Sequence, residues 1–266
     1  MSLEEGKNNE KIKKGDEPNL LSIYKRENPN SDWKNGFRQN AGAEANQSVR
    51  DALKKEQFGL CVYCEIDLKD SGGIGFDDFR VEHFFPENPK AGESRGDGIN
   101  YALHWPNLFG CCTGGNVPHV VESEERYSNP HTHCDVPKMN NDWTAIILDP
   151  TVDIPAFPSL FEFNEEGTIS VSDSCPQEIK EKANKTIEYL KLNTKKIERF
   201  RSATIQKIRD ELLSFPEENL PAVLNELSEA YLCPDNNGKL SPFFSTIRWY
   251  LGPAAEDVLR QSEYND

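Results

Sequence analysis

The feature that most limits how this chain can fold is a pair of cysteines two residues apart, Cys61 and Cys64. They open a stretch, residues 61 to about 149, that is dense in Gly, Pro, Asn, Cys and His and has only short apolar runs. Such a stretch has too thin a core to be stable without a staple. Thiolates at Cys-x-x-Cys spacing can reach one tetrahedral ion at about 2.3 Å from each sulfur. The spacing therefore predicts that this region folds around a metal ion.

A tetrahedral ion needs two further ligands, which the residues alone leave open. The candidates are Cys111, Cys112 and Cys134, or His119, His131 and His133. Seven cysteines is an odd number, and in a reducing compartment a Cys-x-x-Cys pair favours metal over a disulfide framework. A redox role for the pair lacks the βαβ setting that such motifs usually occupy. Cys175 and Cys233 stand alone and are expected to be small buried apolar side chains.

Composition divides the chain into three segments of an α+β fold. Residues 1–45 have few apolar positions among many Lys, Glu, Asn and Gly residues, which predicts poor order apart from an anchor at Trp33 and Phe37. Residues 46–175 are expected to form the metal-bound region with a trailing hairpin. Residues 176–266 are expected to form a helical subdomain.

Apolar periodicity predicts the elements of the last two segments. A helix is expected from Asn46 to Phe58, with Gly59 as its C-terminal cap. Short apolar runs predict strands at 146–148, 160–163 and 169–171, the last two joined as a hairpin. Pro176 suits the first turn of a helix. Apolar positions at helical spacing then predict helices over 177–192, 197–213, 223–232 and 243–251.

The formal net charge of -15 argues against a chain that grips phosphates unaided, because such proteins usually present a basic face. The region from Gln177 to Glu211 is the exception, with ten Lys or Arg against six Asp or Glu. Its clustered cations could contact phosphates or an acidic partner, or could simply form a solvated helix face. They are Lys191, Lys195, Lys196, Arg199 and Arg201.

The sequence contains no run of about 18 apolar residues and no apolar stretch near its start of the kind a signal peptide needs. A cytoplasmic protein without a membrane span is therefore expected.

A carboxylate and a histidine, Glu82 and His83, follow Phe79 and Arg80 in a predicted short strand. An isolated pair of this kind has little meaning, but the surrounding motifs are specific. They are the Cys-x-x-Cys pair before it, Trp105-Pro106-Asn107-Leu108 after it, then Cys112, and finally Cys134-Asp135-Val136-Pro137-Lys138. Together these motifs resemble the zinc-stapled HNH nucleases.

The resemblance implies a zinc-stapled ββα-metal core, in which Cys134 opens a helix. It implies a structural Zn²⁺ on Cys61, Cys64, Cys112 and Cys134, because Cys112 lies five residues after Asn107. It also implies that His83 activates water, that Glu82 and Asp135 hold a catalytic Mg²⁺ or Mn²⁺, and that Asn107 fixes His83. Lys138 is the last residue of the motif, and the resemblance implies that it contacts the nucleic acid.

This sequence departs from the family pattern at two ligands and in one spacing. Glu82 stands where Asp is usual, and Asp135 stands where Asn or His is usual, although both keep an oxygen ligand for a hard cation. The insertion between Cys112 and Cys134 is longer than the two residues usual in the family.

The wider arrangement resembles the HNH subunit of Septu and of retron-linked anti-phage defence systems. That branch implies a nucleic-acid substrate, with DNA favoured and RNA or tRNA as the alternative, and an ATPase partner of the ABC or SMC-like kind. The competing interpretation is an inactive zinc-stapled interaction module. Because Glu82, His83, Asn107 and Asp135 are all present, the sequence favours an active enzyme.

Overall fold

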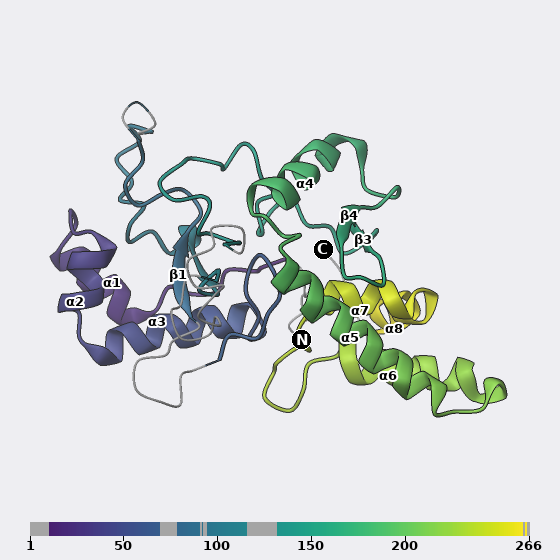
Figure 1. Cartoon of the computed structure of the whole chain (residues 1–266). Coiled ribbons are helices and arrows are strands. Elements are labelled where there is room, and N and C mark those ends of the chain that lie inside the picture. Colours follow the sequence, from purple (N-terminus) through teal and green to yellow (C-terminus); the bar gives the residue numbers. More distant parts are fainter. Residues whose placement is uncertain are drawn as a thin grey trace, which may run out of the picture.

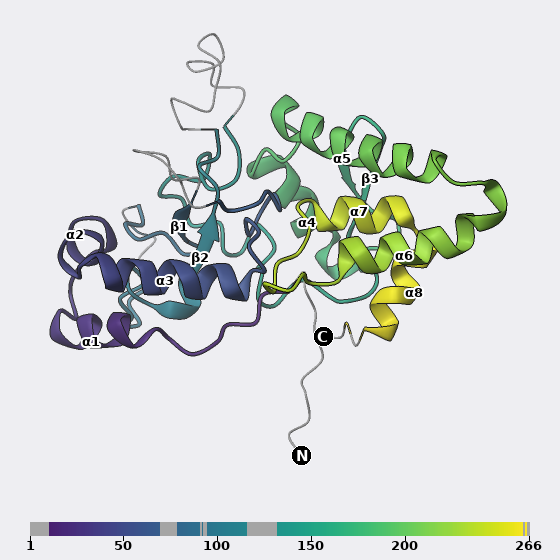
Figure 2. The ribbon, with the colours of Figure 1, turned by 90° about the horizontal axis from the view of Figure 1, so that it is seen from below.

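The computed structural model describes residues 11–69, 79–90, 92, 95–115, 132–262 and 264, and it has the expected mixture of helices and small sheets. Figures 1 and 2 show the N-terminal helices and the first two strands at one end of the molecule and the C-terminal helices at the other. The elements of the first end are α1 (Asn19–Glu27), the π-helix η1 (Trp33–Phe37), α2 (Arg38–Asn40), α3 (Ala43–Glu56), β1 (Arg80–His83), the 3-10 turn η2 (Trp105–Asn107) and β2 (Leu108–Cys111).

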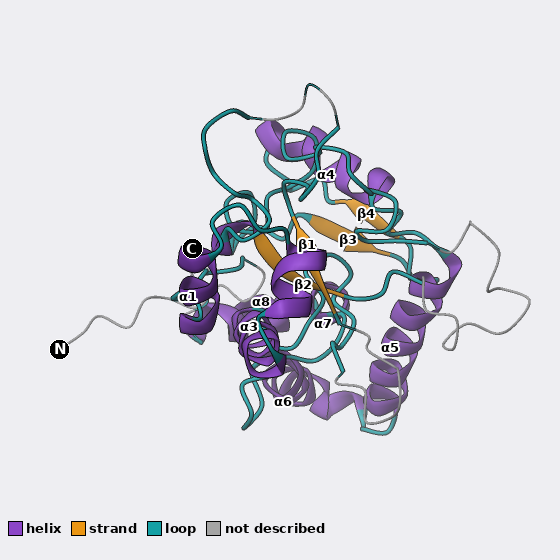
Figure 3. Cartoon of the chain, turned by 90° about the vertical axis from the view of Figure 1, so that its left-hand side faces the viewer, coloured by secondary structure: helices purple, strands orange, loops and turns teal. Residues whose placement is uncertain are grey.

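The elements after residue 150 are mostly helical, and Figure 3 shows how little of the molecule is strand. They are β3 (Phe161–Phe163), β4 (Ile169–Val171), α4 (Gln177–Tyr189), α5 (Lys195–Leu213), the 3-10 turn η4 (Glu217–Asn219), α6 (Leu220–Leu232), α7 (Phe244–Leu251) and α8 (Pro253–Gln261). The predicted hairpin is confirmed as the antiparallel pair β3–β4. The strand predicted at 146–148 is wrong, because these residues form no strand, and α8 was not predicted.

The two strands that position the site, β1 and β2, pair antiparallel, with Val81 opposite Gly110 and His83 opposite Leu108. The end of α3 holds this sheet through the buried Gln57. Its side-chain amide donates to the Gly110 carbonyl at 2.7 Å, and its carbonyl oxygen accepts from the Gly110 N–H at 2.6 Å. A side chain at Gly110 would meet Phe79 at 2.8 Å, so only glycine permits this close approach.

The segment before residue 46 was predicted to be poorly ordered, and for residues 19–45 this is wrong. Helix α1, η1 and α2 follow one another there, and α3 already begins at Ala43. Leu21 and Phe37 are fully buried, and Trp33 is 7% exposed. The few apolar positions suffice because they belong to the same core as the strand region, in addition to the ring contacts of Phe37 with Tyr24 and Trp33. Residues 1–10 lie outside the described residues.

One apolar core crosses the boundary expected at residue 175. It joins residues of the first end, such as Leu21, Val49 and Leu108, to residues of the second, such as Leu190 and Ile197. A further core lies among the C-terminal helices, around Ile208, Leu232, Phe244, Leu251 and Leu259. Within the described part of the chain, no helix is long and apolar enough to cross a membrane.

Candidate active site and metal centre

Four cysteines meet in the interior with the geometry of a tetrahedral metal site. The ligand atoms of Cys61, Cys64, Cys112 and Cys134 all lie within 4.8 Å of one another. Three of the sulfur–sulfur distances are 3.7, 3.7 and 3.9 Å. Four sulfurs at about 2.3 Å from one zinc ion are about 3.8 Å apart. These thiols therefore fit a zinc ion.

Local turns deliver the four sulfurs to one point. The N–H of Cys61 donates to the Ile66 carbonyl at 2.9 Å and its own carbonyl accepts from Glu65, which closes a tight turn around Cys64. The N–H of Cys112 points at the Cys61 sulfur, 3.3 Å away. Cys134 adopts a φ of 58° and donates its N–H to the Leu190 carbonyl at the end of α4. Burial raises the pKa of the Cys134 thiol, so a thiolate at this position needs the charge of a nearby cation.

The neighbouring Cys111 is buried but does not belong to the group of four. Its sulfur lies 3.7 Å from that of Cys61 and 3.6 Å from Oδ1 of Asp135. His133, the reserve candidate for zinc, places Nε2 3.7 Å from the sulfur of Cys112 and so contacts a ligand. His119 and His131 lie outside the described residues. The geometry supports Cys112 as the third ligand, as the family motif implied.

His83 ends β1 at the wall of an open cleft. Its Nε2 lies 3.0 Å from the carbonyl oxygen of Ala102. Because a carbonyl oxygen only accepts, Nε2 carries the proton and Nδ1 is left with a free lone pair. Burial lowers the pKa of this imidazole, which keeps it neutral. The Trp33 ring packs edge-on to the imidazole at 5.7 Å.

Asn107 braces the loop that follows His83. Its Oδ1 accepts from the N–H of Phe85 at 2.7 Å, while Nδ2 donates to the carbonyls of Phe85 and Tyr101, each at 2.9 Å. The carbonyl of Asn107 also accepts from the N–H of Phe84. Asn107 is buried, and none of these hydrogen bonds reaches the imidazole. It therefore affects His83 through the backbone of the loop that follows the histidine.

Two buried carboxylates lie beside His83 on the same cleft. Glu82 accepts from the Tyr63 hydroxyl at 3.1 Å and pairs with the buried Lys138, which also contacts the His83 carbonyl. Asp135 pairs with Arg80 at 2.8 Å. Burial, followed by the charge of Glu82, raises the pKa of Asp135 to about 7. A buried carboxylate whose ionisation is disfavoured, next to a second carboxylate, suits a divalent cation with oxygen ligands.

The cleft itself has a volume of about 1420 Å³. Its lining includes Glu82, His83 and Asp135, together with side chains from η1, α2, α3 and the end of α4. The residues at the ends of several elements thus converge on one opening beside the histidine.

Two of the residues predicted to contact nucleic acid are buried instead. Lys138 is 1% exposed and holds Glu82, and Arg201 is 3% exposed and donates to the carbonyls of Gly167 and Leu192. Both side chains therefore make their contacts inside the protein. Lys195 and Arg199 are exposed and Lys196 is half-buried near the start of α5, but none of these three lines the cleft.

The helix that the family motif places at Cys134 is also absent from the described residues. Residues 134–140 form consecutive turns. Positive φ angles at Cys134 and Met139 and the missing N–H of Pro137 explain why no α-helix forms there.

Sequence reasoning did not single out three side chains of the site. Tyr63 lies inside the Cys-x-x-Cys motif, and burial raises its pKa well above the ordinary value, so it stays a donor to Glu82. Arg80 and Glu87 flank the Glu82-His83 pair in the sequence. Their position next to the motif could have indicated that they belong to the site. The residues with which they form an ion pair or hydrogen bonds, however, are far away in the sequence.

Comparison with known proteins agrees with this arrangement. No protein-family model matches the chain. The chain is 31% identical over 206 residues to an Escherichia coli protein described as "Retron Ec83 putative HNH endonuclease". The match covers 70% of this chain and 75% of that protein.

This relationship shows that the chain belongs to the HNH endonuclease family, as its motifs predicted. It is an endonuclease with a cysteine cluster suited to a metal ion.

Proposed function

We propose that this endonuclease hydrolyses nucleic-acid phosphodiester bonds in the cleft beside His83, with DNA as the favoured substrate. The proposal assigns structural Zn²⁺ to Cys61, Cys64, Cys112 and Cys134, and Mg²⁺ or Mn²⁺ to Glu82 and Asp135. The observation that carries it is the bond between His83 and Ala102, which leaves a neutral imidazole nitrogen as a base next to two buried carboxylates.

In this proposal His83 takes a proton from the attacking water through Nδ1, and the Ala102 carbonyl stabilises the ring as it becomes charged. A divalent ion bound at this place would neutralise charge on the scissile phosphate and on the leaving oxygen. Tyr63 and Lys138 hold the Glu82 carboxylate in place. Asn107 keeps the loop after His83 in one conformation, which sets the direction of the base.

Cleavage assays with plasmid DNA, single-stranded DNA and tRNA test this function. Cleavage is expected with Mg²⁺ or Mn²⁺ and not with chelator. Asp135→Ala should lower the rate at limiting metal by at least about tenfold, because one of the two proposed oxygen ligands is removed. Chelator-resistant cleavage, or an Asp135→Ala protein with wild-type metal dependence, would contradict the catalytic ion. Complete inactivity on all substrates would favour the interaction module.

We further propose that the chain is the effector nuclease of an anti-phage defence complex in the cytoplasm, with an ATPase partner of the ABC or SMC-like kind. Three observations support this: the resemblance of its motifs to that branch, the retron named in its relative's description, and its net charge of -15. A strongly acidic chain repels a polyanion at long range. A basic partner could supply additional phosphate contacts.

Because of its net negative charge, the isolated chain is expected to bind nucleic acid weakly and to cut slowly at about 0.15 M salt, the physiological ionic strength. Purification with the product of a co-transcribed ATPase gene should restore both. Binding and turnover can be measured with and without the partner and nucleotide. Full-rate cleavage by the chain alone under these conditions would refute the need for delivery.

A further inference from the structure

The cleft beside His83 is lined by more cations than the acidic chain around it would suggest. Its basic side chains are Lys34, Arg38, Arg50, Arg80 and Lys191, and its acidic ones are Glu82, Glu87, Asp135 and Glu188. A local balance of five against four contrasts with 30 against 45 in the whole chain. The opening of the site therefore differs in charge from the surface as a whole.

The charges differ with depth. Glu82 and Asp135 are 7% and 6% exposed, whereas three lysines or arginines, Lys34, Arg38 and Lys191, are exposed together with one acidic residue, Glu188. Arg80 is already paired with Asp135. Among the described residues, Lys34, Arg38 and Lys191 have no carboxylate at ion-pair distance. The cleft thus has an acidic floor suited to a cation and a basic rim that is available for an anion.

One side of this rim is hydrogen-bonded to the loop that follows His83. Glu87 accepts from the N–H groups of Trp33, at 2.6 Å, and of Lys34, at 3.2 Å. Asp32 accepts from the N–H groups of Asn35 and Gly36, which holds the start of the same π-helix. With Trp33 packed against the His83 ring, this segment has a defined position relative to the base.

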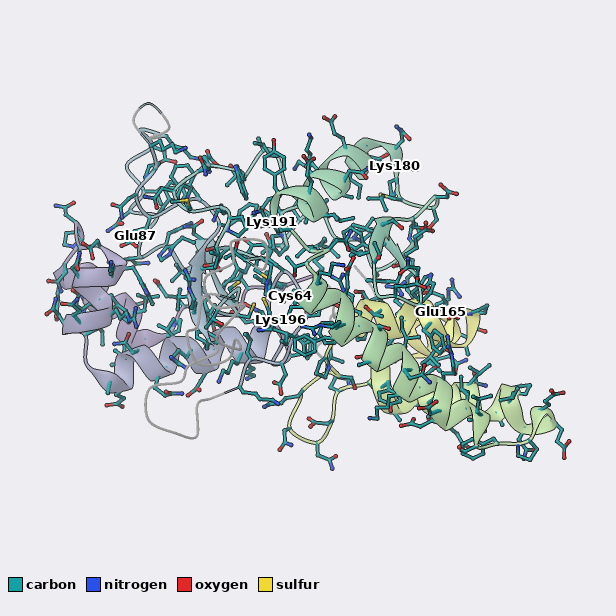
Figure 4. All side chains as sticks on the ribbon, in the orientation of Figure 1. Cys64, Glu87, Glu165, Lys180, Lys191 and Lys196 are labelled. Atoms are coloured by element: carbon teal, nitrogen blue, oxygen red, sulfur yellow. The ribbon has the colours of Figure 1, made fainter. Side chains whose placement is uncertain are left out.

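The other side of the rim is Lys191, which occupies a backbone position that normally favours glycine. Its φ is 50°, its N–H donates to Glu188, and the N–H of Leu192 donates to Ile187. These two bonds form a Schellman motif with Lys191 at the left-handed position after α4. In the view of Figure 4, Lys191 and Glu87 lie on opposite sides of β1. A lysine kept at an unfavourable conformation suggests a use for its side chain.

We infer that Lys34 and Arg38 on one side and Lys191 on the other bind the sugar–phosphate backbone flanking the scissile bond. The inference rests on the proposed function and adds the path of the substrate. Of the cations that the sequence singled out for this role, Lys191 lines the cleft, whereas Lys195, Lys196, Arg199 and Arg201 lie outside its lining. Phosphate contacts position a polynucleotide without reading its sequence, so the effect should be similar for DNA and RNA.

The test measures binding of fluorescent duplex DNA, single-stranded DNA and RNA of one sequence to the full chain carrying His83→Ala, in Mg²⁺, from about 0.05 to 0.2 M salt. Lys34→Gln/Arg38→Gln is expected to weaken binding about tenfold per cation at the lowest salt and to reduce the duplex salt slope by about 1 per cation. The matched control is Arg26→Gln/Lys55→Gln, which removes the same two residue types from exposed positions outside the lining.

Lys191→Gly provides a second, independent arm. Glycine relieves the left-handed conformation, so the melting temperature should stay the same or rise while binding weakens about tenfold. This combination separates a phosphate contact from a structural role. Unchanged binding by both the double variant and Lys191→Gly, losses as large in the control pair, or no measurable binding by the His83→Ala chain at 0.05 M salt would each overturn the inference.

Failure of the inference can be told apart from failure of the proposed function. If the chain with intact His83 cuts and the rim variants bind and cut like wild type, the catalytic assignment stands and the backbone path is wrong. If no cleavage occurs under any condition but the rim variants lose binding, the path stands and the chemistry is wrong.

Discussion

Replacing Cys61 or Cys134 by serine is expected to unfold the strand region and to abolish zinc binding. Structural zinc binding contributes roughly 10–16 kcal/mol in small zinc-dependent folds, as much as the entire stability of many domains, typically about 5–15 kcal/mol. The four sulfurs also join the Cys61 turn, the end of β2 and the loop tied to α4, so loss of the ion removes a link shared by three segments. Elemental analysis should find about one zinc per wild-type chain, and circular dichroism should report the loss of structure.

Adjacent cysteines supply the control. Cys112→Ser should lose zinc, whereas Cys111→Ser should keep it, because the Cys111 sulfur is outside the group of four. Cys175→Ser, far from the group in sequence, should also keep it. A folded wild-type protein without zinc would refute the metal site, and a zinc-loaded Cys112→Ser protein would transfer the ligand role to Cys111 or His133.

His83→Ala should lower the cleavage rate by about 10²–10⁴-fold, the range attributed to a positioned general base, or to the limit of detection. Zinc content and thermal unfolding should change little, since within the described part of the chain the ring makes one hydrogen bond, to the Ala102 carbonyl. Single-turnover cleavage with saturating metal measures the effect on chemistry.

His104→Ala is a suitable comparison, because His104 is half-buried in the same region but does not line the cleft. It should cut at a rate within a few-fold of wild type. If the His83→Ala protein cuts as fast as the His104→Ala protein, the proposed base is wrong.

The parts of the site that the sequence predicted are those whose chemistry is local. The Cys-x-x-Cys spacing predicts two metal ligands, and the Glu82-His83 pair predicts a carboxylate ligand beside a general base, each from residues within a few positions. Cys111 and Cys112 are adjacent in the sequence, so residue type could not distinguish them, and the choice depended on the family motif. The structure supports it, because only Cys112 meets the other three sulfurs.

The misjudged residues are those whose partners lie far away in the sequence. Lys138 and Arg201 look like surface cations, but one meets Glu82 and the other two backbone carbonyls, and these contacts bury them. Trp33 and Phe37 were predicted as anchors and are buried, but the order of the segment around them also depends on Glu87, 54 residues after Trp33. Composition describes a segment by itself, whereas its order depends on what it packs against.

The attachment of residues 19–45 has a practical consequence for truncation. A fragment starting at residue 46 would retain every motif residue named above, and a designer guided by motifs would choose it. It would also remove the Trp33 ring from His83 and uncover the apolar surface that Leu21 and Phe37 normally fill. Such a fragment would be prone to aggregation, and its inactivity would say nothing about the enzyme.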